Sequence, residues 1–191
     1  DQLRDKLKLN AAMIQLPIGL EDKHVGHVDL VKMVARYFEG ENGNTIRETE
    51  IPADMIDQAN EHREILIDAL TQIETPACEE LMMLAMEEEE IPEALLMQAV
   101  REGVISLNLC PVFCGSAYKN VGVQALLDAV NRYLPNPTEV ENIALDLDND
   151  ETEVKVEDDP EQSLVALAFK LEDGRYGQLT YVRIYRGTLN K

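Results

Sequence analysis

The sequence predicts a mixed α/β (α+β) chain, with a small antiparallel sheet and helices followed by a strand–loop–helix unit and further strands. Three observations support this fold class. Apolar residues flank an Asn-Gly pair at 42–43, as in a β-hairpin. Residues 54–73 have the apolar spacing of a helix. An apolar run at 107–113 meets the small residues 114–117 (CGSA), and a helix start follows at Gly122.

The first half of the chain is expected to form a helix end, the sheet and three helices. Pro52 and Pro92 stand where helices are expected to begin, because the fixed backbone angle of proline suits a first helical turn, and Thr75 with Pro76 marks a break between two helices. The expected elements are the end of an amphipathic helix at 2–8, a strand at 12–18, strand-like residues at 26–38, a turn at 41–44, a returning strand at 45–51, and helices at 54–73, 78–90 and 92–104.

The second half is expected to contain one strand and helix, an acidic stretch and a final set of strands. Residues 141–161 are rich in carboxylates and poor in large apolar side chains, which favours a solvated linker or irregular loop. Glycines at 174, 177 and 187 mark turns between alternating segments. The expected elements are a strand at 109–113, a helix at 121–134 that Pro135 and Pro137 end, and strands at 163–171, 178–186 and from 188 onward.

The composition allows one domain of ordinary size or two small ones. Hydrophobic residues make up 45% of the 191 residues but aromatic residues only 5%, so aliphatic side chains must fill the core. The formal net charge is −20, from 37 acidic and 17 basic residues. We therefore expect no direct binding of nucleic acid by this chain, because phosphates would repel it, and a partner with a basic surface.

The cysteines and histidines give no sign of a disulfide framework or a metal site. Three cysteines without regular spacing indicate a reducing compartment. Cys110 and Cys114 with His24 or His27 lack zinc spacing. No apolar run reaches the ~20 residues that span a bilayer, so no membrane partner is expected. No signal-peptide pattern is present, although a chain that opens at Asp1 leaves a lost presequence open.

Eight short segments carry a resemblance that extends over nearly the whole chain. They are 14–19 (IQLPIG), 28–33 (VDLVKM), 51–54 (IPAD), 114–120 (CGSAYKN), 122–130 (GVQALLDAV), 133–137 (YLPNP), 166–170 (ALAFK) and 177–181 (GQLTY). In this order and at this spacing they resemble elongation factor G, the bacterial and organellar translocase of the ribosome. Residues 171–177 resemble mitochondrial-type and atypical bacterial members more than the commonest bacterial form.

The resemblance implies a fragment of a P-loop GTPase domain that carries an inserted strand-plus-helix subdomain and is followed by the start of a β-barrel. The phosphate-loop, DxxG and NKxD motifs of a GTPase do not occur in these 191 residues. We expect the parent protein to bind GTP or GDP with Mg²⁺ and to hydrolyse GTP, whereas this chain alone binds no nucleotide and is inactive. The implied parts are a helix remnant of the GTPase domain at 1–11, the inserted subdomain at 12–104, the end of the GTPase domain at 105–140, an acidic linker at 141–162, and the start of the domain II barrel at 163–191.

Residues 114–120, here called the guanine loop, correspond to the last guanine-nucleotide motif of that family. The resemblance implies that the Ala117 amide donates to guanine O6, that Ser116 braces the loop, and that Lys119 lies over or beside the base. Tyr118 either belongs to this site or packs under the following helix. The residues alone also fit a tight strand-to-helix connection without a ligand. No catalytic residue is expected, because the water-orienting histidine of the family belongs to the switch region.

Five carboxylates at spacings of three, four, three and four fall on one face of the helix predicted at 54–73. We call this row the acidic stripe: Asp54, Asp57, Glu61, Glu64 and Asp68. Like charges at these spacings repel by a few tenths of a kcal/mol per pair, which suggests a docking surface for a cationic partner. An ordinary solvated helix face is the alternative. The opposite, packing face is predicted to be Ile56, Ala59, Leu66, Ile67, Leu70 and Ile73.

The resemblance implies a partner for the acidic stripe and a location in the cell. Elongation factor G acts on the ribosome, and its inserted subdomain touches the basic C-terminal domain of the stalk protein. The implied location is the cytoplasm, with a mitochondrion as the other option. The alternatives to a translocase are a related translational GTPase of the recycling, protection or release type, and an acidic adaptor without enzymatic function.

Overall fold

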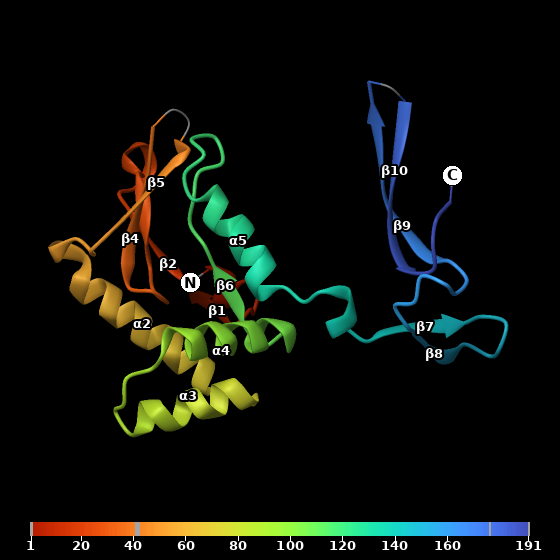
Figure 1. The fold of residues 1–191 in the computed structure, drawn as a ribbon, viewed down its shortest axis with the longest axis horizontal. Helices are drawn as coiled ribbons and strands as arrows, with labels where there is room; N and C mark the ends of the chain where they lie inside the picture. Colours follow the sequence, from red (N-terminus) through yellow and green to blue (C-terminus); the bar gives the residue numbers. More distant parts are fainter. Residues whose placement is uncertain (1, 41–42, 176, 191) are drawn as a thin grey trace. The chain divides into compact units, whose positions relative to one another are not determined.

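The computed structural model describes residues 2–40, 43–175 and 177–190. The chain divides into two compact units, Asp1–Leu134 and Pro135–Lys191, which are considered separately. Helices and strands are mixed, which confirms the α/β class (Figure 1). The elements of the first unit are α1 (Gln2–Asp5), β1 (Ala11–Met13), β2 (Gln15–Ile18), η1 (Glu21–Lys23), β3 (Gly26–Asp29), β4 (Val34–Glu39), β5 (Thr45–Thr49), η3 (Ala53–Met55), α2 (Ile56–Thr71), α3 (Pro76–Met86), α4 (Glu93–Ile105), β6 (Cys110–Val112) and α5 (Val123–Tyr133).

One stretch of extended chain belongs to two sheets, where the sequence predicts a single strand at 12–18. β1 pairs in parallel with β6, and β2 pairs antiparallel with β3. Ile14 joins the two: its N–H donates to the Val112 carbonyl at 3.0 Å, and its carbonyl accepts from the Leu30 N–H at 2.9 Å. The strand is divided because its two ends find different neighbours.

A four-stranded antiparallel sheet with the order β2-β3-β4-β5 forms the first layer of this unit. The strand-like residues 26–38 become two strands, because Asp29 caps a turn between them. Its Oδ1 accepts the N–H groups of Val31 and Lys32, each at 3.0 Å. Glu41 and Asn42 of the expected Asn-Gly turn lie outside the described residues, and β4 and β5 pair on either side of them.

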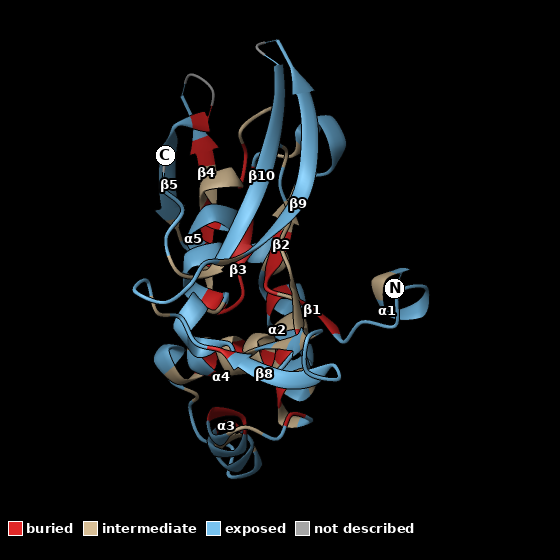
Figure 2. Cartoon of the chain, turned by 90° about the vertical axis from the view of Figure 1, so that its right-hand side faces the viewer, coloured by how far each residue is buried: buried red, intermediate tan, exposed pale blue. Residues whose placement is uncertain are grey.

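The helices α2, α3 and α4 contribute to the larger core cluster, and strands β2, β3 and β4 also carry buried residues, coloured red in Figure 2. α2 and α4 begin and end within about two residues of the predicted bounds, whereas α3 ends at Met86 and leaves the acidic run 87–90 outside the helix. Carboxylates oppose the helix dipole at a C-terminus, which accounts for this earlier end. The fully buried leucine side chains among these helices are Leu66, Leu70, Leu81 and Leu96.

One prediction about an apolar residue was wrong. Ile56 is 42% exposed rather than packed, because it is the first residue of α2 and lies at the end of the core. On α3, Met83 and Met86 are 56% and 78% exposed, whereas Met97 of α4 packs against the core.

The second unit consists of two β-hairpins and a short 3-10 turn. Residues 141–161 were expected to be a solvated linker or irregular loop, but they contain a hairpin, in which Val154 and Val156 alternate with polar residues and lie opposite Ala144 and Asn142. No strand follows residue 188 in the described part of the chain. The elements of this unit are η4 (Pro137–Glu139), β7 (Asn142–Asp146), β8 (Thr152–Val156), β9 (Val165–Gly174) and β10 (Gly177–Arg186).

Candidate guanine loop and acidic stripe

The guanine loop connects β6 to α5 through a closed turn. Ser116 and Val121 form an antiparallel bridge, with N–H to carbonyl distances of 2.8 and 3.0 Å in the two directions. Inside this bridge the Asn120 N–H donates to the Ala117 carbonyl at 3.2 Å, and Asn120 has a left-handed backbone (φ 52°). The residues predicted to read a base are therefore held on a turn with defined backbone geometry.

Two glycines make this turn sterically feasible. A Cβ at Gly122, where φ is +80°, would lie 2.7 Å from the Cys114 carbonyl oxygen. A Cβ at Gly115 would lie 2.7 Å from the Val121 carbonyl oxygen. Real Cβ atoms do not approach backbone oxygens this closely, so the strand and the helix start can come together only because neither residue has a side chain.

The four predicted site residues have different environments. The Ser116 Oγ accepts the Lys119 N–H at 3.4 Å, within the loop. Ala117 is exposed, and no residue in the described ranges accepts its amide. Tyr118 is fully exposed, so it does not pack under α5. The Lys119 Nζ donates to the Asp22 carbonyl at 2.9 Å, so the lysine is held at η1.

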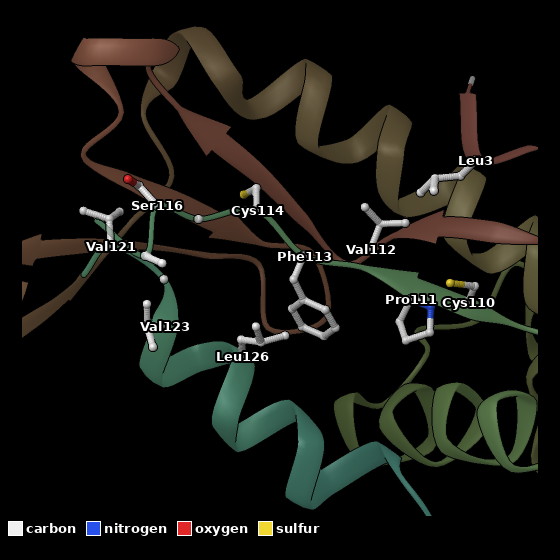
Figure 3. A pocket seen from close by; sticks show the side chains of 13 residues that line it. Leu3, Cys110, Pro111, Val112, Phe113, Cys114, Ser116, Val121, Val123 and Leu126 are labelled. Carbon is white, nitrogen blue, oxygen red and sulfur yellow. The ribbon is translucent and has the colours of Figure 1, made fainter. Parts of the chain in front are cut away.

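A pocket of about 470 Å³ lies beside the loop (Figure 3). Its lining is mostly apolar and comes from the strand segment at 110–113, from Leu3 of α1, and from Val123 and Leu126 of α5. Gly115, Ser116 and Ala117 complete the wall. An apolar wall next to exposed backbone amides suits a flat heterocycle, whose face needs apolar contact and whose edge needs hydrogen bonds.

Sequence reasoning missed the contacts that fasten the guanine loop to the four-stranded sheet. The Cys114 N–H donates to the Gln15 Oε1 at 3.3 Å, and the Gln124 Nε2 donates to the Gly43 carbonyl at 3.4 Å. These partners are 99 and 81 residues apart in the chain, so no local pattern could pair them. A polar Gln15 in an otherwise apolar strand was the one available signal.

The acidic stripe is exposed along its whole length. Asp54 lies in η3, and the other four carboxylates lie on α2. No lysine, arginine or histidine among the described residues forms an ion pair with any of the five. Asp68 borders a shallow hollow with Arg4 and Lys8, also without an ion pair. The stripe is thus directed to solvent.

The back of α2 is fixed to the core. Ala59, Leu66 and Leu70 are fully buried on it. The Arg63 Nη1 also donates to the carbonyls of Leu30 and Val31 at 2.6 and 2.8 Å. Because these contacts fix the rotation of the helix, the outward direction of the stripe is a property of the fold.

Two absences concern the described residues only. Across residues 2–40, 43–175 and 177–190, no group of three or more His, Cys, Asp or Glu side chains is placed to hold a metal ion. Within the same ranges, every helix is too short or too polar to span a lipid bilayer.

Comparisons with known proteins show which sequences this chain is similar to. No protein-family model matches the chain. It is 56% identical over 191 residues to elongation factor G 1 of Borrelia garinii subsp. bavariensis, 59% identical to elongation factor G 1 of Desulfotalea psychrophila, and 52% identical over 190 residues to that of Treponema pallidum. Each match covers the whole chain and 27% of the relative.

One solved structure has a similar fold. A crystal structure of a protein from Thermus thermophilus superimposes with a TM-score of 0.67 at 27% identity, over 97% of this chain and 24% of that one. In sequence, the chain is thus similar to translation elongation factors. In particular, it is similar over its full length to one segment of elongation factor G and spans about a quarter of that protein, which confirms the predicted resemblance.

Proposed function

We propose that this chain is the part of an elongation factor G that docks on the basic C-terminal domain of the ribosomal stalk protein and supplies the guanine loop of a GTP site. The parent protein would hydrolyse GTP with Mg²⁺ during translocation, in the cytoplasm. Residues 12–104 would be the docking subdomain inserted into the GTPase domain, which resumes at 105–140. The hairpin of β9 and β10 would begin the barrel of domain II after the acidic stretch at 141–162.

The observation that carries the docking role is a row of solvent-directed carboxylates on a helix whose back is fixed. Asp57, Glu61, Glu64 and Asp68 project from one face of α2, next to Asp54. Such a row has little structural value, because its members repel one another. It gives a cationic partner a charged surface that speeds encounter and fixes register. We therefore expect the affinity for the stalk domain to fall with salt.

The test is charge reversal on the stripe. The double variant Glu61→Lys, Glu64→Lys should bind the isolated stalk C-terminal domain at least tenfold more weakly, with a flatter salt dependence, in an NMR titration. The matched control is Glu79→Lys, Glu80→Lys, which makes the same charge change at exposed positions of α3. Equal affinity for wild type and the stripe variant would refute stalk docking by α2. An equal loss in both variants would indicate a response to net charge alone.

The guanine role is proposed for the loop as part of a larger site. The motifs that cradle phosphates do not occur in the 191 residues, and most nucleotide affinity comes from phosphate contacts. We therefore expect the chain alone neither to bind GDP measurably nor to hydrolyse GTP. Isothermal titration of the chain with GDP checks this, and micromolar binding would contradict it.

A further inference from the structure

Gln15 occupies a buried position between the guanine loop and the four-stranded sheet. Gln15 is only 3% exposed. Its Oε1 accepts the Cys114 N–H at 3.3 Å, and its Nε2 lies 3.1 Å from the His27 Nε2. Cys114 is the second residue after β6, and His27 lies in the middle of β3. One amide side chain therefore links the first part of the loop to the adjoining strand of the sheet.

The Cys114 contacts fix the orientation of the Gln15 amide. A backbone N–H can only donate, so the oxygen of Gln15 must face it. The Cys114 Sγ lies 4.0 Å from the same oxygen. Burial raises the pKa of this thiol to about 11, so it keeps its proton and is a second, weaker donor. Rotating the amide by 180° would bring an NH₂ group against both donors.

The amide orientation in turn fixes the protons of His27. The Gln15 Nε2 can only donate, so the His27 Nε2 must accept and carries no hydrogen. The ring is therefore neutral, with its hydrogen on Nδ1, which has no partner among the described residues. Its ring packs 5.4 Å from that of Phe38 between centroids. Burial lowers the pKa of His27 to about 4, Arg36 and His24 act in the same direction, and only Asp29 opposes them.

We propose that Gln15 is a positioning residue for the guanine loop, which it holds in register with the sheet by an N–H···O=C–N–H···N relay from Cys114 to His27. The assignment to guanine reading rests on the proposed function, whereas the relay itself is a property of this chain. Gln15 suits the position because it offers one acceptor and one donor at opposite ends of a planar group. Leucine would leave two buried polar groups unsatisfied, and glutamate would place an acceptor against an acceptor.

The relay acts at the point where sheet pairing ends. β6 stops at Val112, and the bridge that closes the turn starts at Ser116. The Gln15 contact lies between these two anchors, while Lys119 and Gln124 hold the far side of the loop to Asp22 and Gly43. Removing the Gln15 contact should make residues 114–117, including the Ala117 amide, more mobile without unfolding the helices.

The test uses NMR of the 191-residue chain without nucleotide. In the wild type, ring ¹⁵N shifts of His27 should show the neutral tautomer with hydrogen on Nδ1 from pH 8 to pH 5.5. In Gln15→Leu, exchange of the Cys114 amide should become at least tenfold faster, with shift changes at 115–117 and unchanged protection in α3. In Gln15→Glu, the titration midpoint of His27 should rise by at least one pH unit, because a carboxylate then faces its Nε2.

The controls are Gln58→Leu and Gln58→Glu, the same changes on the exposed side of α2, which should alter neither readout. A hydrogen on His27 Nε2 in the wild type would overturn the relay. Unchanged exchange of the Cys114 amide and unchanged shifts at 115–117 in a folded Gln15→Leu variant would also overturn it. If that variant does not fold, the wild-type tautomer and Gln15→Glu decide the question. No readout depends on guanine binding, so failure of the relay and failure of the proposed function are distinguishable.

Discussion

At the scale of single residues, the guanine loop depends on the conformational freedom of Gly122. This residue precedes α5 with φ +80°, and it faces the Cys114 carbonyl where a Cβ would need to be. Gly40 provides a natural comparison, because its φ is +78° but its nearest neighbour is the Thr45 hydroxyl, a side-chain atom that can move. Substitutions at the two sites therefore distinguish the cost of a left-handed backbone from the added cost of a backbone clash.

We expect Gly40→Ala to lower the free energy of unfolding by about 1 kcal/mol, the cost of a left-handed backbone at a residue with a Cβ. Gly122→Ala should cost at least about 1 kcal/mol more, because the loop must also move away from Cys114. Urea denaturation of both variants checks the difference. Equal costs would show that the loop accommodates the added methyl group.

The buried His27 predicts a pH dependence of stability. Burial lowers its pKa from 6.5 to about 4. The unfolded state therefore binds a proton more readily between these values, so His27 stabilises the native state above pH 6.5 and this contribution is lost as the pH falls towards 4. The free energy of unfolding should fall by about 2 kcal/mol from this residue between pH 7 and pH 5.

Urea denaturation at the two pH values measures this loss. His27→Gln should show a pH dependence smaller by that amount, whereas the control His62→Gln should keep the wild-type dependence. The comparison removes the contribution of the carboxylates, which all three proteins share. A wild-type slope in His27→Gln would mean that another group titrates in this range.

At the scale of elements, α2 is attached to the sheet by Arg63, which donates to two carbonyls of the turn after β3. Arg47 makes the contrasting contact, an exposed ion pair with Glu39 at the edge of the sheet. A donor to part-buried carbonyls is worth more than a solvated pair, because the carbonyls cannot regain water without local opening.

Arg63→Met should therefore lower the free energy of unfolding by about 2 kcal/mol, and Arg47→Met should lower it much less, because its ion pair is solvated. Chemical denaturation of the two variants measures both. Equal small losses would place the attachment of α2 entirely in its apolar face, that is in Ala59, Leu66 and Leu70.

Elements with strong local signals were predictable, and those defined by distant partners were not. The helices follow from prolines and apolar spacing, which are local. The hairpin of β7 and β8 was missed because dense carboxylates hide the alternation of Val154 and Val156 with polar residues. The guanine loop was recognisable as a motif. The Gln15 contact was not, because it depends on which strand folds against residue 114.

At the scale of the whole molecule, the two units differ in how well they are stabilised. The first has two clusters of buried apolar side chains, a larger one among the helices and a smaller one between the four-stranded sheet and α2. In the second, Val156 is buried and the large apolar side chains of β9 and β10 are mostly exposed. A hairpin without a packed face has little stability of its own.

Limited proteolysis should therefore cleave first within 135–191, leaving a resistant product that ends near residue 134. Mass spectrometry of the products identifies the boundary, and circular dichroism of the purified product should retain the helical signal. Early cleavage within α2–α4 would contradict the difference in stability between the units.

The division of residues 11–18 between two sheets has a mechanical consequence. A force on the four-stranded sheet reaches β1 through unbroken backbone at Ile14, and passes to β6 through the hydrogen bonds between β1 and β6 and from Ile14 to Val112. A partner that pulls on the sheet would therefore also apply force to β6, the strand that leads to Cys114. Pulling at the sheet should thus strain the guanine loop before it stretches any linker.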